Sequence, residues 1–209
     1  MKNLLKNHRY ILLICLFFMT ACSINTQTKS TEYAARGTMY MKMGKYEKAE
    51  KYLNKAIQAN PYNLDAYKDR GSLYYNLAKY EQALKDFDYA LSYEPINSSL
   101  LSAKGAALAS LGKYEESFKA LAAALQLHPA NVAALNSIAG LYYLDNNFAK
   151  AAEIYSVSLS YQTTPEAYLM RGKCYLQIGD KENAENDFAM AKLLKHGTGD
   201  TTPKEAETK

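Results

Sequence analysis

The sequence predicts an all-α fold built from about five repeated helix-turn-helix units. Three kinds of residue recur at a step of 34 positions, a period typical of repeat architectures. They are the glycines Gly37, Gly71 and Gly105, the prolines Pro61, Pro95 and Pro129, and the asparagines Asn63, Asn97 and Asn131. The glycine row continues at Ala139 and, after a step of 33, at Gly172, which brings the number of units to five.

Residues 1–21 have the pattern of a signal peptide. Three basic residues precede an apolar run from Tyr10 to Met19, which is too short to span a bilayer. The following "MTAC" resembles the lipobox of bacterial lipoproteins, although Met19 stands where leucine is usual. The resemblance implies that the chain is cut before Cys22 and lipidated there. Since Ser23 is not aspartate, it also implies the periplasmic side of the outer membrane of a Gram-negative bacterium. The alternative is an ordinary secretory peptide cut nearby.

Charge and cysteine content exclude two classes of protein. The formal net charge is +4, and removing the three basic residues of the signal peptide, Lys2, Lys6 and Arg9, leaves +1. We therefore expect no nucleic-acid partner. Loss of the signal peptide and lipidation of Cys22 would leave Cys174 as the single free thiol, so no disulfide framework can hold this fold together.

After the signal peptide we expect a polar tether at residues 22–29, a repeat array at 30–196 and a disordered tail at 197–209. The tail lacks apolar periodicity. The predicted units are 30–63, 64–97, 98–131, 132–164 and 165–196. The first helix of units two to five should begin after a side chain that caps free amide groups, namely Asn63, Asn97, Asn131 or Thr164.

The end of each helix also has a predicted residue. The first helix should close in the left-handed conformation at Gly44, Gly112, Gly179 or Asn146, whereas Ala78 suits that conformation less well. The second helix should end before the recurring proline. The recurring glycine should lie where the two helices cross, because a larger side chain there would cost about 1–3 kcal/mol. Most of the nineteen tyrosines should then be core and spacer residues.

The pattern within each unit resembles the tetratricopeptide repeat. In the second unit the matching residues are Tyr67, Gly71, Tyr74, Ala83, Phe87, Ala90 and Pro95. The fourth unit departs most, with Ser158 for the last alanine and Thr163 for the proline. The resemblance implies a right-handed superhelical solenoid whose first helices line a concave surface. It also implies a protein that binds protein partners.

No residue pattern indicates catalysis or a cofactor. His128 and His196 lack a cysteine or carboxylate at metal-ligand spacing, and neither has the supporting acid of a catalytic triad. Cys174 falls in register with core positions of the other units and should be a small buried apolar residue. We therefore expect a non-enzyme with no cofactor, no metal and no small-molecule substrate.

The expected binding site is the concave groove, which should take a peptide or a helix from a protein partner. Small residues from Ser102 to Gly140 would form its floor, between Tyr75 and Tyr143. Alternatively, these small residues only set the curvature of the array. A lysine-based clamp for a terminal carboxylate is excluded, because small residues fill the other positions it needs. The predicted groove residues are Lys68, Ser72, Tyr75, Ser102, Ala106, Asn136, Gly140, Tyr143 and Lys173.

These features together predict a membrane-anchored scaffold for protein partners in the bacterial envelope. A short lipidated repeat protein of this kind is similar to the pilotin and assembly lipoproteins of type IV or Flp pili. That similarity implies assistance in assembling a pilus or secretin machine. One alternative is an adaptor that organises cell-wall hydrolases or a periplasmic protease. Another is a non-catalytic subunit of an envelope enzyme.

Overall fold

The computed structural model describes residues 26–197, and over this range the chain forms ten helices arranged in pairs. The all-α class and the five repeats are thereby confirmed. The predicted signal peptide, Cys22 and most of the predicted tail lie outside the described residues. The chain divides into two compact units between Glu94 and Pro95, and each is described by itself.

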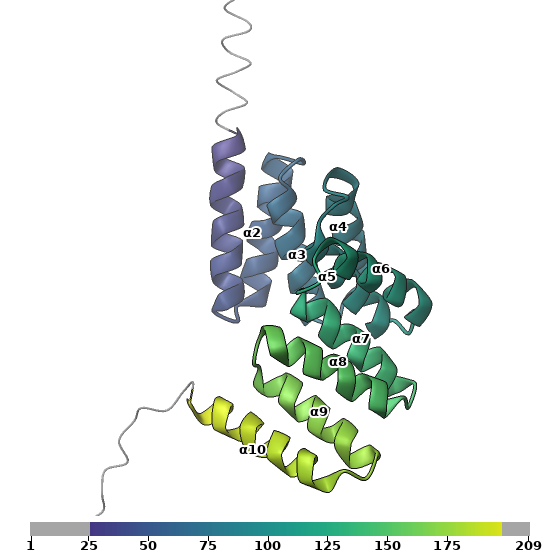
Figure 1. Ribbon diagram of the computed structural model, residues 1–209. Helices are drawn as coiled ribbons and strands as arrows, with labels where there is room; N and C mark the ends of the chain where they lie inside the picture. Colours follow the sequence, from purple (N-terminus) through teal and green to yellow (C-terminus); the bar gives the residue numbers. More distant parts are fainter. Residues whose placement is uncertain (1–25, 198–209) are drawn as a thin grey trace, which may run out of the picture. The chain divides into compact units, whose positions relative to one another are not determined.

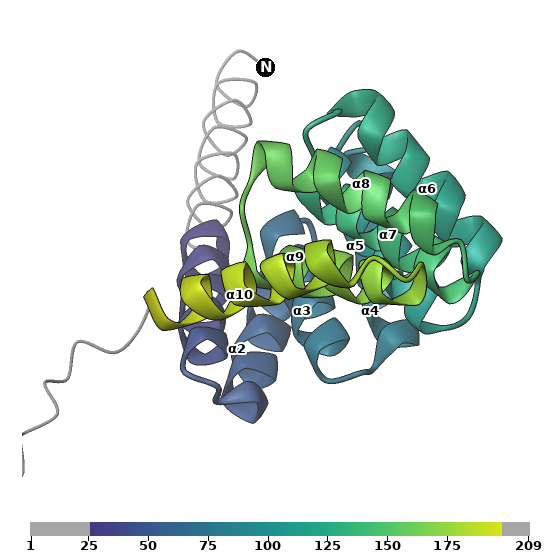
Figure 2. The same cartoon turned by 60° about the horizontal axis from the view of Figure 1, so that its bottom comes forward.

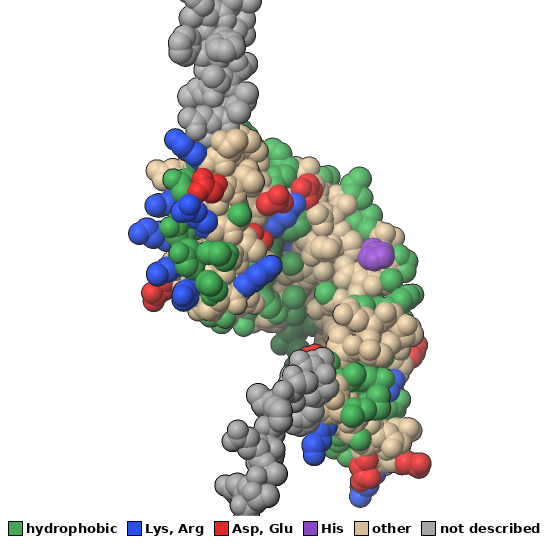
Figure 3. All heavy atoms as spheres, turned by 90° about the vertical axis from the view of Figure 1, so that its left-hand side faces the viewer, with side chains coloured by type: hydrophobic (Ala, Val, Ile, Leu, Met, Phe, Trp, Pro, Cys, Tyr) green, Lys and Arg blue, Asp and Glu red, His purple; other side chains and the backbone are tan. Residues whose placement is uncertain are grey.

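Unit 1 contains the first two repeats (Figure 1). Its helices are residues 26–42, α2 (Tyr46–Ala59), α3 (Leu64–Asn76) and α4 (Tyr80–Tyr93). The first helix includes residues 26–29, which were predicted to belong to the polar tether before it. The added turn has contacts of its own, because Thr31 Oγ1 donates to the carbonyl of Gln27 at 3.0 Å and the Gln27 side chain accepts from Asn60 at the end of α2. Lys and Arg side chains gather on one face of this unit (Figure 3).

Unit 2 contains the other three repeats. Its helices are α5 (Ser98–Ser110), α6 (Tyr114–Leu127), α7 (Val132–Leu144), α8 (Phe148–Tyr161), α9 (Pro165–Gln177) and α10 (Lys181–Gly197). Each helix packs against the next along the chain, and α5 also packs against α7. The close pairing of α9 with α10 is visible in a second view (Figure 2).

The predicted helix starts are confirmed. The side-chain oxygens of Asn63, Asn97 and Asn131 accept hydrogen bonds from backbone N–H groups three residues on, at 3.2, 3.0 and 3.0 Å. Thr164 does the same at 3.2 Å, with Pro165 in the first turn of α9. Each cap satisfies an amide that the helix itself leaves unpaired.

The predicted helix ends are confirmed as well. Backbone φ is positive at all five positions: Gly44 (69°), Ala78 (55°), Gly112 (74°), Asn146 (58°) and Gly179 (85°). Glycine and asparagine adopt this left-handed conformation readily, whereas the Cβ of alanine opposes it. The end of α3 is therefore the least favourable of the five.

The recurring glycines lie at the close crossing of the paired helices. A Cβ added at Gly37, Gly71, Gly105 or Gly172 would come within 2.6–2.8 Å of a side chain on the partner helix. Those side chains are Leu53, Phe87, Leu121 and Phe188. The core of each repeat is thus fixed by a small residue facing a large one, as the sequence predicts.

A buried ion pair that the sequence analysis missed joins the two helices of the second and fifth repeats. Arg70 donates to Asp86 through Nε and Nη2 at 2.8 and 2.7 Å, and Arg171 binds Asp187 with the same geometry. Both aspartates are only 4% exposed. The spacing of 16 residues, present twice, was the available sequence signal.

Candidate functional site

The predicted groove residues lie on the first helix of four repeats. In unit 1, α3 carries Lys68, Ser72 and Tyr75. In unit 2, α5 carries Ser102 and Ala106, α7 carries Asn136, Gly140 and Tyr143, and α9 carries Lys173. We refer to these residues as the inner-face residues.

The inner-face residues of unit 1 already have partners within that unit. Lys68 Nζ lies 2.7 Å from Glu94 and 3.3 Å from Asp65. Partial burial opposes the charge on Lys68, but these two carboxylates outweigh it and raise the pKa of the lysine. Ser72 donates to the carbonyl of Lys68, and the rings of Tyr75 and Tyr80 meet edge-on at 5.5 Å. A ligand carboxylate would therefore have to compete with Glu94 for Lys68.

The inner-face residues of unit 2 are mostly small or internally bonded. Ser102 donates to the carbonyl of Ser99 at 2.9 Å, and Asn136 Oδ1 accepts from Ser158 at 2.6 Å. A Cβ at Gly140 would meet only the Tyr155 hydroxyl, at 3.9 Å. Helix packing thus does not require glycine at 140, which distinguishes this residue from the glycines at the helix crossings.

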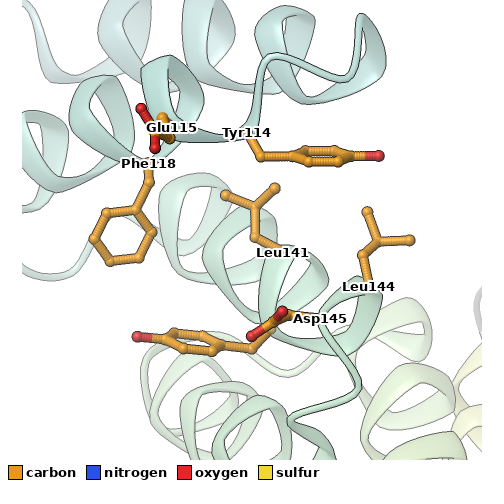
Figure 4. A pocket seen from close by; sticks show the side chains of 7 residues that line it. Tyr114, Glu115, Phe118, Leu141, Leu144 and Asp145 are labelled. Carbon is orange, nitrogen blue, oxygen red and sulfur yellow. The ribbon is translucent and has the colours of Figure 1, made fainter.

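An open apolar cleft lies elsewhere in unit 2, between α6 and α7 (Figure 4). Its volume is about 420 Å³, within the range of ligand-binding pockets. Phe118 and Tyr142 meet edge-to-face, with ring centroids 6.2 Å apart, while Phe118 is 42% and Leu144 60% exposed. We call this the α6/α7 cleft, and it is lined by Tyr114, Glu115, Phe118, Leu141, Tyr142, Leu144 and Asp145.

The charge of the α6/α7 cleft has one sign. Glu115 and Asp145 are among its lining residues, and no Lys, Arg or His is. Both acidic residues are exposed. The cleft therefore offers an apolar surface beside two carboxylates, a combination that suits an apolar side chain flanked by basic residues.

Unit 1 has the equivalent cleft between α2 and α3, displaced by 68 residues in the sequence. Its volume is about 590 Å³, and its lining is Gly44, Lys45, Tyr46, Glu47, Lys48, Glu50, Leu77 and Lys79. Glu50 takes the place of Phe118, and Asn76 takes the place of Leu144. Glu50 accepts from the Tyr74 hydroxyl at 3.0 Å and lies 3.6 Å from Lys79. The α2/α3 cleft thus differs in carrying charged side chains of both signs, and its Glu50 is already bonded within the protein.

The α6/α7 cleft was not predicted from the sequence, because the predicted groove lay only on the first helix of each pair. The signal was available at position 118. The equivalent residues in the five repeats are Glu50, Leu84, Phe118, Ala152 and Glu185. A large aromatic residue there, beside Leu144 where α3 has Asn76, marks the third and fourth repeats as different from the first two.

The described residues show neither a metal site nor a reactive thiol. Within residues 26–197 no group of three or more His, Cys, Asp or Glu side chains could hold a metal ion. Cys174 is fully buried, as predicted, and burial raises the pKa of its thiol to about 11. A thiol that remains protonated is a poor nucleophile. No helix in the same range is long and apolar enough to cross a membrane.

Comparison with solved structures finds the same fold in several proteins. Pseudomonas aeruginosa PilF superposes with a TM-score of 0.70 at 20% identity, covering 81% of this chain and 78% of that one. MamA from Desulfovibrio magneticus RS-1 gives 0.65 at 20% identity, with coverages of 82% and 98%. TTC0263, a thermophilic repeat protein from Thermus thermophilus, gives 0.71 at 19% identity, with coverages of 84% and 93%. No curated protein matches the sequence.

Family comparison assigns the repeats directly. The tetratricopeptide repeat matches residues 31–63, 68–127, 103–165 and 165–192, which leaves only 64–67 unmatched between residues 31 and 192. Repeats of this family act as scaffolds for protein-protein interaction and are typically non-catalytic. The chain belongs to the tetratricopeptide repeat family.

Proposed function

We propose that this chain is a membrane-anchored scaffold in the bacterial envelope and that it holds a protein partner in the α6/α7 cleft. The proposed partner site is supported by the exposed apolar lining of that cleft, which includes the exposed side chains of Phe118 and Leu144. Aromatic side chains in such a setting are frequent binding hot spots. The anchor rests on the lipobox-like residues that end at Cys22.

The cleft also indicates the chemistry of its occupant. We propose a partner segment that inserts an aliphatic or aromatic side chain between α6 and α7 and carries Lys or Arg beside it. The basic residue would pair with Glu115 or Asp145, whose carboxylates have no basic neighbour in the lining. Charge complementarity of this kind contributes mainly to specificity and to the rate of association.

The inner-face residues form the second contact surface in this proposal. Ser102 is buried, but Ala106 and Gly140 are small and partly exposed, and Gly140 is not required by packing, so a helix or extended segment can approach the backbone there. Ala106→Arg should block that approach without unfolding unit 2, because Ala106 is only partly buried. Partner recovery should fall at least tenfold while helical content stays constant. Unchanged recovery would remove the inner face from the proposal.

The finer function we propose is assistance in assembling a pilus or secretin machine. Its support is the resemblance of the lipidated repeat architecture to pilus-assembly lipoproteins, together with the fold shared with PilF. An adaptor for cell-wall hydrolases or a periplasmic protease shares the anchor and the fold. The partner therefore decides between the two functions.

The deciding experiment is crosslinking in intact cells, followed by recovery of the protein from solubilised membranes. Wild type is compared with Cys22→Ala, which removes the lipid anchor, and with Phe118→Glu, which alters the cleft. We expect secretin or pilus proteins with wild type and their loss with both variants. Hydrolases or a protease in their place would support the adaptor, and no specific partner at all would overturn the scaffold.

A further inference from the structure

The small net charge of the chain conceals a strong division between its first repeat and the rest. Residues 22–61 contain seven Lys or Arg and three Asp or Glu, which gives +4. Residues 62–209 contain fifteen Lys or Arg and eighteen Asp or Glu, which gives −3. This asymmetry does not appear in the net charge of the whole chain, and it indicates an anionic partner at one end of the chain.

The charge of the first repeat is concentrated on one surface. Lys48, Lys51 and Lys55 recur on α2 at steps of three and four, which places them on one side of the helix, next to Arg36 of the first helix. Figure 3 shows Lys and Arg side chains gathered around apolar ones on the N-terminal part of the described chain. We call this surface the basic face, and it consists of Arg36, Lys48, Lys51, Lys55, Tyr33, Tyr40 and Tyr52.

Two lysines of the basic face lie over tyrosine rings, in cation–π contact. Lys48 Nζ lies 5.7 Å from the Tyr40 ring centroid, and Lys55 Nζ lies 5.4 Å from that of Tyr52. The rings of Tyr40 and Tyr52 stack on each other at 5.3 Å. Among the described residues, none of the three lysines forms an ion pair, so their charge is not neutralised by the protein.

We infer that the basic face rests on the anionic phospholipid headgroups of the membrane that holds the protein. The position of the basic face supports this inference, which in this respect depends on the proposed anchor. The first described helix begins at residue 26, four positions after Cys22. Four residues extend at most about 14 Å, so a lipid on Cys22 would keep unit 1 close to the headgroups.

The chemistry of the basic face fits a headgroup layer. Phospholipid phosphates attract Lys and Arg, and tyrosine is enriched at membrane surfaces because its ring is apolar and its hydroxyl is polar. Single-stranded nucleic acid instead requires exposed aromatic faces on which bases can stack. Here Tyr33, Tyr40 and Tyr52 are partly buried and lie beneath the protein's own cations, so the basic face offers no such platform.

The test uses the full chain incorporated into two kinds of vesicle, one of phosphatidylcholine and one that also contains phosphatidylglycerol. An amine-reactive label followed by mass spectrometry reports the accessibility of each lysine. We expect Lys48, Lys51 and Lys55 to be labelled roughly fivefold more slowly in the anionic vesicles, with the difference lost at high salt. The exposed unit 2 lysines Lys113, Lys119 and Lys192 should show no difference.

Matched variants separate this inference from the proposed anchor. In wild type, Lys29 of the first helix should also be labelled more slowly in the anionic vesicles. With Lys48→Gln, Lys51→Gln and Lys55→Gln together, this protection of Lys29 should be lost. With Lys113→Gln, Lys119→Gln and Lys192→Gln, the protection of Lys29 should persist.

Protein that floats with both vesicles but shows equal labelling overturns the basic-face inference and leaves the anchor intact. Protein that fails to float with neutral vesicles overturns the anchor, while charge-dependent protection would still support the basic face. Tighter binding to a DNA oligonucleotide than to anionic vesicles would also overturn the inference.

Discussion

α3 in unit 1 and α7 in unit 2 occupy the same position in their repeats, 68 residues apart, and their backbones begin and end in the same way. The chemistry around them differs. Arg70 on α3 binds Asp86, whereas the equivalent residues Ile138 and Ile154 belong to one apolar cluster. Tyr74 on α3 donates to Glu50, whereas Tyr142 on α7 packs against Phe118.

This difference shows which positions the fold constrains and which it leaves open. Gly71 and Ala139, at the crossing of the paired helices, are both small and both buried. The positions around them accept either a hydrogen-bonded polar pair or an apolar pair, because both satisfy the interior. In the α2/α3 cleft Glu50 is bonded to Tyr74 and lies near Lys79, whereas in the α6/α7 cleft the equivalent Phe118 is an exposed apolar contact surface.

The largest expected effect concerns the buried ion pair beside α3. Asp86→Ala would leave Arg70 charged, with a side chain only 19% exposed, and should lower the free energy of unfolding by about 3–5 kcal/mol. Urea unfolding followed by circular dichroism measures this loss. Asp187→Ala in the fifth repeat should behave alike, since the geometry of its pair with Arg171 is the same.

The double variant Arg70→Ile with Asp86→Ile gives α3 the residues of α7 and tests the comparison directly. Its stability should return to within about 1.5 kcal/mol of wild type, because replacing both partners of a buried ion pair is often neutral or stabilising. If the double variant were as unstable as Asp86→Ala, an apolar pair could not replace the buried ion pair at this position.

The next effect concerns partner binding by the α6/α7 cleft. Phe118→Glu combined with Leu144→Asn gives this cleft the residues of its unit 1 counterpart. Because an aromatic hot spot contributes at least about 2 kcal/mol, affinity for the crosslinked partner should fall roughly 30-fold. Ile96→Asn, at another exposed apolar residue of unit 2, is the matched control and should leave the affinity unchanged. Equal loss in the control would indicate a general effect of surface apolarity.

Much of the fold could be predicted from the sequence because its requirements are local and recur with the period. Asn63 as a cap, Ala78 at positive φ and Gly71 at a helix crossing each follow from one residue type in one register. The added turn at residues 26–29 could not be predicted in this way, because it lies before the first repeat and its Gln27 contacts the distant Asn60.

The candidate site was harder to predict, since exposure depends on how neighbouring repeats pack. Phe118 reads as an ordinary apolar residue on a helix, and only the packing of α6 on α7 leaves it 42% exposed beside Leu144. The internal hydrogen bond of Asn136 to Ser158 also depends on a neighbouring helix. The boundary between the two units has no signature in the repeat, because Pro95 occupies the same position as Pro61 and Pro129.

A smaller effect is expected where α3 and α7 end. Ala78→Gly should raise the free energy of unfolding by about 0.5–1 kcal/mol, because glycine adopts the positive φ of 55° without the steric cost of a Cβ. Asn146→Gly should raise it less, since asparagine already accepts this conformation. Thermal unfolding of the two variants side by side measures the difference. An equal gain at both positions would show that the alanine is not strained.

The smallest expected effect is confined to alkaline pH and concerns Tyr74 in the polar surroundings of α3. Burial, together with the hydrogen bond to Glu50, raises the pKa of Tyr74 from 10 to about 12. The unfolded chain therefore loses this proton first, so the contribution of Tyr74 to stability is complete below pH 10 and is lost as the pH rises to 12. Burial also raises the pKa of Tyr155 in α8, so both units should lose stability in the same direction. Tyr74→Phe should make the fall in unfolding free energy between pH 10 and 12 shallower without abolishing it. A slope that Tyr74→Phe leaves unchanged would assign the alkaline loss to the other buried groups with raised pKa values, Cys174 and Tyr155, and the hydrogen bond to Glu50 would no longer distinguish α3 from α7.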